Sequence, residues 1–172
     1  MRTGETEPPA TYELHDAERV TVRRHTPEVL EVAAEWAAGE HPPLPHLHPH
    51  QDERFEVHEG ELTVDLDGKR HVLRPGDTLD VPRGTRHRMF NSGGSTARAT
   101  WQVMPAGRTA EFWAAIHEAR KTKPTDAHGM LTPPAAAPIL REYRDVFRLG
   151  LPDAVARPAL AALSAVARLR GI

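Results

Sequence analysis

Residues 45–60 read PHLHPHQDERFEVHEG, and this stretch brings three candidate metal ligands close together in the chain. Side chains two residues apart on a β-strand face the same way, so His46 and His48 can aim two imidazoles at one point. Glu53 has the same parity as Phe55 and Val57, which alternate with charged neighbours in the next expected strand. We therefore expect Glu53 to point into the same interior as these apolar residues.

A second stretch, residues 76–91, reads GDTLDVPRGTRHRMFN and supplies a fourth candidate ligand. Pro82 and Gly84 form a turn, which brings His87 to the site as the fourth candidate ligand. Three neutral imidazoles and one carboxylate suit Fe, Mn, Ni, Co, Cu or Zn, and they do not suit Ca or Mg. The sequence therefore predicts one divalent transition-metal site, without choosing among these metals. Its ligands are His46, His48, Glu53 and His87.

Short runs of alternating apolar and polar residues surround both stretches, over residues 19–105. Leu62, Val64 and Leu66 form one such run, and Asp67-Gly68 then supplies the residues that a tight hairpin needs at positive φ. Gly and Pro separate the runs, and no helical period intervenes. Short, evenly spaced strands of this kind predict an all-β sandwich or closed barrel.

The two ends of the chain differ from this β region. Residues 1–18 carry Pro8-Pro9 and scattered charges, which are typical of an N-terminal arm. Over residues 106–172, Ala becomes abundant and the apolar period becomes helical. Two or three helices are expected, at 108–120, 135–148 and 153–169. Because this segment has no second complete core, we expect a C-terminal helical extension that docks on the β region or on a partner subunit.

Composition excludes several classes of function. The 172 residues contain no cysteine, so a disulfide framework, a thiolate metal site and a cysteine nucleophile are all absent. The formal net charge is −2, which gives no electrostatic footprint for nucleic acid. The first residues lack an apolar signal region, and no stretch is long and apolar enough for a membrane span. We therefore expect a cytoplasmic protein with no membrane or nucleic-acid partner.

The two stretches together resemble the paired motifs of the cupin superfamily, and in particular small single-domain cupins of the quercetin-dioxygenase-like kind. The first motif runs from the His46-x-His48 pair through Glu53 to Gly60, and the second consists of Gly76, Pro82-x-Gly84, His87 and Asn91. The match covers residues 28–104, with one departure at Glu40, where a glycine is expected. The resemblance implies a jelly-roll barrel with the metal held in its interior by the four candidate ligands.

Three functions are compatible with such a site. Four protein ligands leave an octahedral ion two positions for a substrate and O₂, or for a bidentate substrate. Resemblance to small cupins suggests a dioxygenase-type oxidoreductase acting on a small aromatic or enolisable molecule, with Glu53 as a possible proton acceptor. A cyclase, isomerase or lyase would use the metal without redox chemistry. The third alternative is a non-catalytic cupin that binds a small molecule.

Some roles stay open at this point. His50 either faces the substrate or lies at a strand end, and Gln51 either bonds a metal-bound water or closes its turn. Asn91 is expected to stabilise its loop through backbone groups. The C-terminal extension either caps the barrel mouth and gates the substrate or mediates dimerisation. A C₂ homodimer is the default expectation, because jelly-roll proteins leave sheet edges and apolar faces to be covered.

Overall fold

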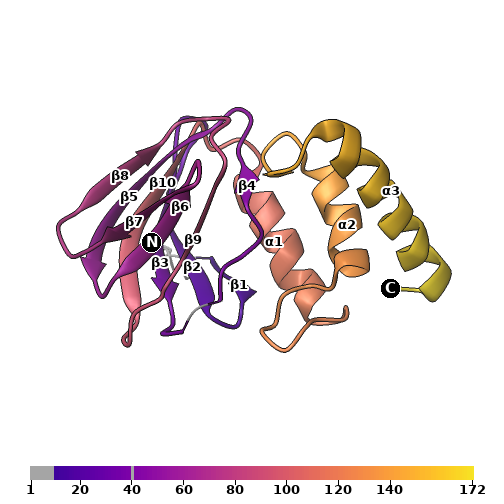
Figure 1. Ribbon diagram of the computed structural model, residues 1–172, viewed down its shortest axis with the longest axis horizontal. Coiled ribbons are helices and arrows are strands. Elements are labelled where there is room, and N and C mark those ends of the chain that lie inside the picture. The colour runs from indigo at the N-terminus through magenta and orange to yellow at the C-terminus, as the bar shows by residue number, and fades with distance from the viewer. Residues whose placement is uncertain (1–9, 40) are drawn as a thin grey trace, which may run out of the picture.

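The computed structural model describes residues 10–39 and 41–172 as two antiparallel sheets followed by three helices (Figure 1). The first half of the expected N-terminal arm, and the departure at Glu40, lie outside the described residues. Within the arm as predicted, Thr11–His15 already forms a strand (β1) that pairs with the next one. The β region therefore begins before residue 19.

The larger sheet has six strands in the order β1-β2-β3-β10-β5-β8. Apolar residues alternate along its central strands, so that one face of each is buried; in β3, for example, Leu30, Val32, Ala34 and Trp36 are all buried. Val32 pairs with Trp101 of β10, and Trp101 pairs with Phe55 of β5. The strands are β1 Thr11–His15, β2 Glu18–His25, β3 Leu30–Trp36, β5 Asp52–Glu59, β8 Thr78–Val81 and β10 Ala97–Met104.

The smaller sheet has five strands in the order β11-β4-β9-β6-β7, and it includes a strand from the C-terminal extension. Asp67 and Gly68 join β6 to β7 with φ values of 46° and 80°, which confirms the predicted hairpin. Gly60 of the first motif also has a positive φ, and a Cβ there would lie 2.4 Å from the Thr96 carbonyl oxygen. The strands are β4 His46–Leu47, β6 Leu62–Leu66, β7 Lys69–Leu73, β9 His87–Phe90 and β11 Arg148–Leu149.

The two sheets enclose one hydrophobic core, and the predicted all-β jelly roll with a helical extension is confirmed. The sheets form a sandwich and do not close into a continuous barrel. The core continues beyond the sheets, because Phe112, Trp113 and Val146 from the extension are buried in it. Of the two predicted docking partners, the β region and a partner subunit, the extension packs on the β region of its own chain.

The extension contains helices α1 Thr109–Arg120, α2 Pro133–Glu142 and α3 Asp153–Arg170. α1 lies against the jelly roll, α2 lies beside it, and α3 is the outermost helix (Figure 1). Two prolines begin α2 at the first helical positions, where a missing N–H costs no hydrogen bond. The prediction of a helix continuing to residue 148 was wrong, because Arg148 and Leu149 pair with β4 as a strand. No helix within the described ranges is both long and apolar enough to cross a membrane.

Candidate metal centre

The structure brings the four predicted ligands together between the two sheets. His46 on β4 pairs directly with His87 on β9, His48 follows β4, and Glu53 lies on β5 of the opposite sheet. One imidazole nitrogen from each of the three histidines lies within 4.8 Å of the other two. All four side chains are buried. The four predicted residues therefore lie together, although His48 is one residue beyond the end of β4.

Each imidazole is oriented by a backbone carbonyl. Nδ1 of His46 lies 3.0 Å from Leu44 O, Nδ1 of His48 lies 2.6 Å from Val146 O, and Nδ1 of His87 lies 2.9 Å from Thr85 O. A carbonyl oxygen only accepts hydrogen bonds, so each Nδ1 carries a hydrogen, and in the neutral ring the Nε2 lone pair is available to a metal. Metal-binding histidines are commonly held in this way by a group on the second nitrogen.

Glu53 completes the cluster from the opposite sheet. Its Oε1 accepts a hydrogen bond of 3.0 Å from Trp101 Nε1 and lies 3.2 Å from His48 Nε2. Its Oε2 lies 2.9 Å from His87 Nε2. His48 Nε2, His87 Nε2 and Glu53 Oε2 are buried and make no hydrogen bond within the described protein. Buried polar atoms are rarely left without partners, and a divalent transition metal would satisfy all three.

The protonation states also fit a cation. Burial alone would raise the pKa of the Glu53 carboxyl, but the imidazoles of His48 and His87 outweigh burial and lower that pKa to about 2. Burial lowers the pKa of His46 well below its usual value, and it lowers the pKa of His48 as well. Burial opposes protonation of His87 too, but contact with Glu53 raises the pKa of His87 overall. At neutral pH, Glu53 is ionised and His46 and His48 are neutral, as metal ligands must be.

A cavity of about 190 Å³ adjoins the cluster, with His46 and His48 in its wall. The rest of its lining is mainly apolar and aromatic, and includes Leu44, Met89, Trp101, Phe112, Trp113 and Leu140. Most of these residues come from the jelly-roll interior, from α1 and from α2. A small, largely apolar molecule would therefore lie beside the imidazoles with little water around it.

The C-terminal extension contributes directly to the cluster, which the sequence did not indicate. The Phe147 ring stacks on the His46 imidazole, with ring centres 4.5 Å apart and an interplanar angle of 22°. The neighbouring Val146 supplies the carbonyl that holds His48. Leu149 of β11 pairs with His46 itself. The apolar spacing predicts a helix at Phe147, so it gives no sign of this stacking. The role of Val146 rests on a backbone carbonyl, which no sequence motif marks as functional.

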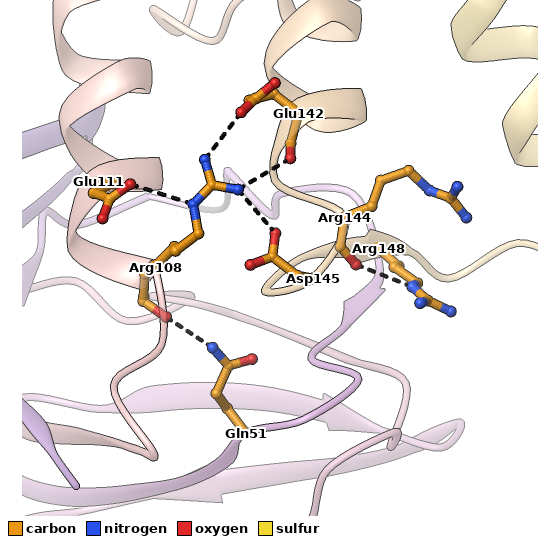
Figure 2. A network of polar contacts seen from close by, with 8 residues as sticks. Gln51, Arg108, Glu111, Glu142, Arg144, Asp145 and Arg148 are labelled. Carbon is orange, nitrogen blue, oxygen red and sulfur yellow. Dashed lines mark hydrogen bonds and ion pairs between the residues drawn. The ribbon is translucent and has the colours of Figure 1, made fainter. Parts of the chain in front are cut away.

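An ion-pair network fixes this part of the extension to α1 (Figure 2). Arg108, just before α1, contacts Glu111, Glu142 and Asp145, and its guanidinium also lies over the Tyr143 ring. Asp145 directly precedes Val146 in the chain. The network therefore holds the backbone next to the carbonyl that orients His48.

The remaining motif residues have structural roles. Gln51 is buried, and its Nε2 donates a hydrogen bond of 3.2 Å to Thr109 Oγ1 (Figure 2), which ties its turn to α1. His50 is exposed in the bend between β4 and β5. Asn91 donates to the carbonyls of Trp36 and Ser95, which confirms its predicted role in the loop.

Comparison with known proteins connects this geometry to a family and to named relatives. Residues 33–103 match the family model described as a cupin domain. The chain is similar to "Polyketide synthase CurC" of Streptomyces cyaneus, with 42% identity over 60 residues that make up 35% of this chain and 39% of that protein. It is also similar to "Oxidoreductase iacF" of Pestalotiopsis fici, with 46% identity over 56 residues, 32% of this chain and 27% of that protein. The matches thus span well under half the length of these curated relatives.

Solved structures share the fold at low sequence identity. An RmlC-like cupin from Shewanella frigidimarina superposes with a TM-score of 0.53 at 20% identity, over 64% of this chain and 96% of that chain. The aligned share of the present chain is about the size of its jelly roll. This likeness supports the fold alone.

Proposed function

The chain belongs to the cupin superfamily, and on that premise we propose that it is a metal-dependent oxidoreductase of the dioxygenase type acting on a small, largely apolar organic molecule. One observation carries the proposal. Three buried imidazoles, each with its Nδ1 bound to a carbonyl, face a buried carboxylate at the wall of an apolar cavity. Relatives named as oxidoreductases support the redox assignment.

We assign His46, His48, Glu53 and His87 as the metal ligands. A bound Fe, Mn, Ni, Co, Cu or Zn ion would supply Lewis acidity and, where the ion is redox-active, reactivity toward O₂. Glu53 is ionised, and we assign its carboxylate to accept a substrate proton, because a ligand carboxylate can shift between a metal and a substrate. The aromatic side chains of the cavity would exclude water and pack against the faces of a planar substrate.

A second candidate is a cyclase, isomerase or lyase that uses the same ligands without redox chemistry. The match to a protein named as a polyketide synthase favours this alternative, since it suggests an enolisable, ring-forming substrate class. The two candidates share the same four metal ligands and differ in whether the reaction consumes O₂.

Metal replacement separates the candidates. The full chain, purified without a chelator or a metal-binding tag, is analysed for metal and then reloaded with each of the six ions. Quercetin and anthrone are offered as planar oxygenated probes, in air and under nitrogen. Turnover that requires O₂ and fails with Zn supports the dioxygenase, whereas turnover with Zn under nitrogen supports the second candidate. Absence of any stoichiometric metal in correctly folded protein would overturn both.

We also propose a homodimer in the cytoplasm. Three apolar side chains on or just before the outermost helix α3 (Figure 1) are more than half exposed: Leu151, Val155 and Leu169. A second copy packed along α3 would bury them. Light scattering coupled to size-exclusion chromatography should give twice the monomer mass for the full chain, and Val155→Glu with Leu169→Glu should return the monomer. A monomeric full chain would overturn the dimer.

A further inference from the structure

The cavity beside the metal centre has a second ionisable pair in its wall. Among the described residues that line it, four have carboxylate or imidazole side chains: His46 and His48 of the metal centre, and His15 and Glu18 at the turn between β1 and β2. The rest of the lining is aliphatic, aromatic, proline or methionine. An apolar pocket with a few convergent polar groups uses those groups to orient its ligand.

The two side chains are buried together and face each other. His15 Nε2 lies 3.0 Å from Glu18 Oε2, and both residues are less than a tenth exposed. His15 Nδ1 accepts a hydrogen bond of 3.3 Å from the backbone N–H of Ala17. Nδ1 therefore keeps its lone pair, and Nε2 carries the hydrogen. The short contact of this Nε2 with Glu18 does not have the geometry of a hydrogen bond, so the buried Nε2 makes no hydrogen bond within the described protein.

Contacts outside the pair also hold its turn in place. Asp16, inside the same turn, forms an ion pair with Arg120 of α1, and its N–H donates to the carbonyl of His128. Arg120 also donates to the carbonyls of Glu13 and Gly129. These contacts fix the β1–β2 turn to the helical extension on its outer side. A buried donor without a hydrogen bond at a cavity wall calls for another explanation.

We propose that His15 and Glu18 form a second polar binding site of the cavity, which takes a hydroxyl or carbonyl group of the substrate. The proposal rests on the proposed function, because it assigns the same cavity to the substrate. The Nε2–H of His15 can donate to a substrate oxygen, and the Glu18 carboxylate can accept from a substrate hydroxyl. The substrate class is then an apolar, ring-containing molecule with two separate oxygen functions, one near the metal ligands and one at this pair.

The test compares ligands that differ in one hydroxyl. The full chain is titrated with 2-naphthol and with the 1,5-, 2,6- and 2,7-dihydroxynaphthalenes, both metal-free and loaded with Zn. A hydrogen bond to a charged group should make at least one diol bind about tenfold more tightly than 2-naphthol. In the double variant His15→Leu with Glu18→Leu, which leaves no unpaired buried charge, this preference should vanish while 2-naphthol binding changes by less than about twofold.

Controls keep this outcome separate from folding and from the metal. His58→Leu removes an exposed histidine of β5 and should leave the diol preference intact. If the double variant fails to fold, the isosteric Glu18→Gln replaces it and should still reduce the preference. A diol preference that is absent from the wild type, or that survives in these variants, overturns the proposal. Failure to bind any of the six candidate ions would overturn the proposed function only, because the preference is also measured in metal-free protein.

Discussion

The jelly roll and the C-terminal extension contribute to the metal centre in different ways. The jelly roll provides all four proposed ligands, at positions that two sequence motifs determine. The extension provides none of them, but its Val146 carbonyl orients His48 and its Phe147 ring covers His46. The motifs thus determine which atoms meet, whereas the surrounding chain determines how those atoms are oriented and how far they are shielded from water.

Loss of a ligand from the jelly roll should have the largest effect. Replacing a group that only holds a ligand commonly weakens metal binding by about 10–100-fold. We therefore expect His48→Ala or Glu53→Gln to weaken Zn or Co binding by more than about a hundredfold, measured by competition with a chromogenic chelator. His50→Ala is the matched control, since His50 belongs to the same stretch but is exposed. Stoichiometric metal retained by both ligand variants would contradict the assignment.

Loss of the Phe147 ring should have an intermediate effect, because this ring packs on a proposed ligand without binding the metal. Phe147→Leu keeps an apolar side chain but removes the stacking on His46. We expect metal affinity to fall by about tenfold. Phe112→Leu is the matched control, because Phe112 packs on Phe147 and Tyr143 and makes no ring contact with a proposed ligand. Equal metal affinity in Phe147→Leu and in wild type would show that the Phe147 ring covers the site without contributing to metal binding.

The histidines that contact the extension and the histidine that does not should also differ in how they affect the stability of metal-free protein at acid pH. His46 and His48, which contact the extension, have pKa values lowered mainly by burial. As the pH falls below about 6.5, the unfolded chain takes up protons at these two sites and the folded protein does not, so the free energy of unfolding falls. His87, beside Glu53, has a raised pKa and acts with the opposite sign. Its stabilising contribution is present below about pH 6.5 and is lost as the pH rises through its folded pKa.

Urea unfolding between about pH 7 and about pH 5 measures this balance. The double variant His46→Gln with His48→Gln should lose less stability than the wild type over this range. Glu53 acts at lower pH, because its pKa of about 2 gives stability that is fully present above about pH 4.5 and is lost on further acidification. An unchanged pH slope in the double variant would show that these two histidines are not neutral in the folded protein.

The sequence predicted the parts of this protein that obey a fixed spacing. The positions of the four proposed ligands follow from strand parity and two motifs, and the Asp67-Gly68 hairpin follows from its need for positive φ. The roles of Val146 and His15 could not be predicted in this way. Val146 acts through a backbone carbonyl that every residue has, and His15 acts at the wall of a cavity that forms only when the jelly roll, α1 and α2 pack together.

The Arg108 network should give the smallest effect, and it tests how rigidly the extension must be held. Arg108 contacts Glu111, Glu142 and Asp145 (Figure 2), but these pairs are largely exposed, and exposed ion pairs contribute little to stability. Arg108→Gln should lower the melting temperature slightly and weaken metal binding by less than about threefold. Arg144→Gln is the matched control, since Arg144 pairs with Asp153 of α3 and should leave metal affinity unchanged. If Arg108→Gln instead weakened metal binding as much as Phe147→Leu does, the position of Val146 would depend on this surface network. The packing of Phe147 and Val146 in the core would then be insufficient to orient His48, and control of the metal centre would extend to the surface of the extension.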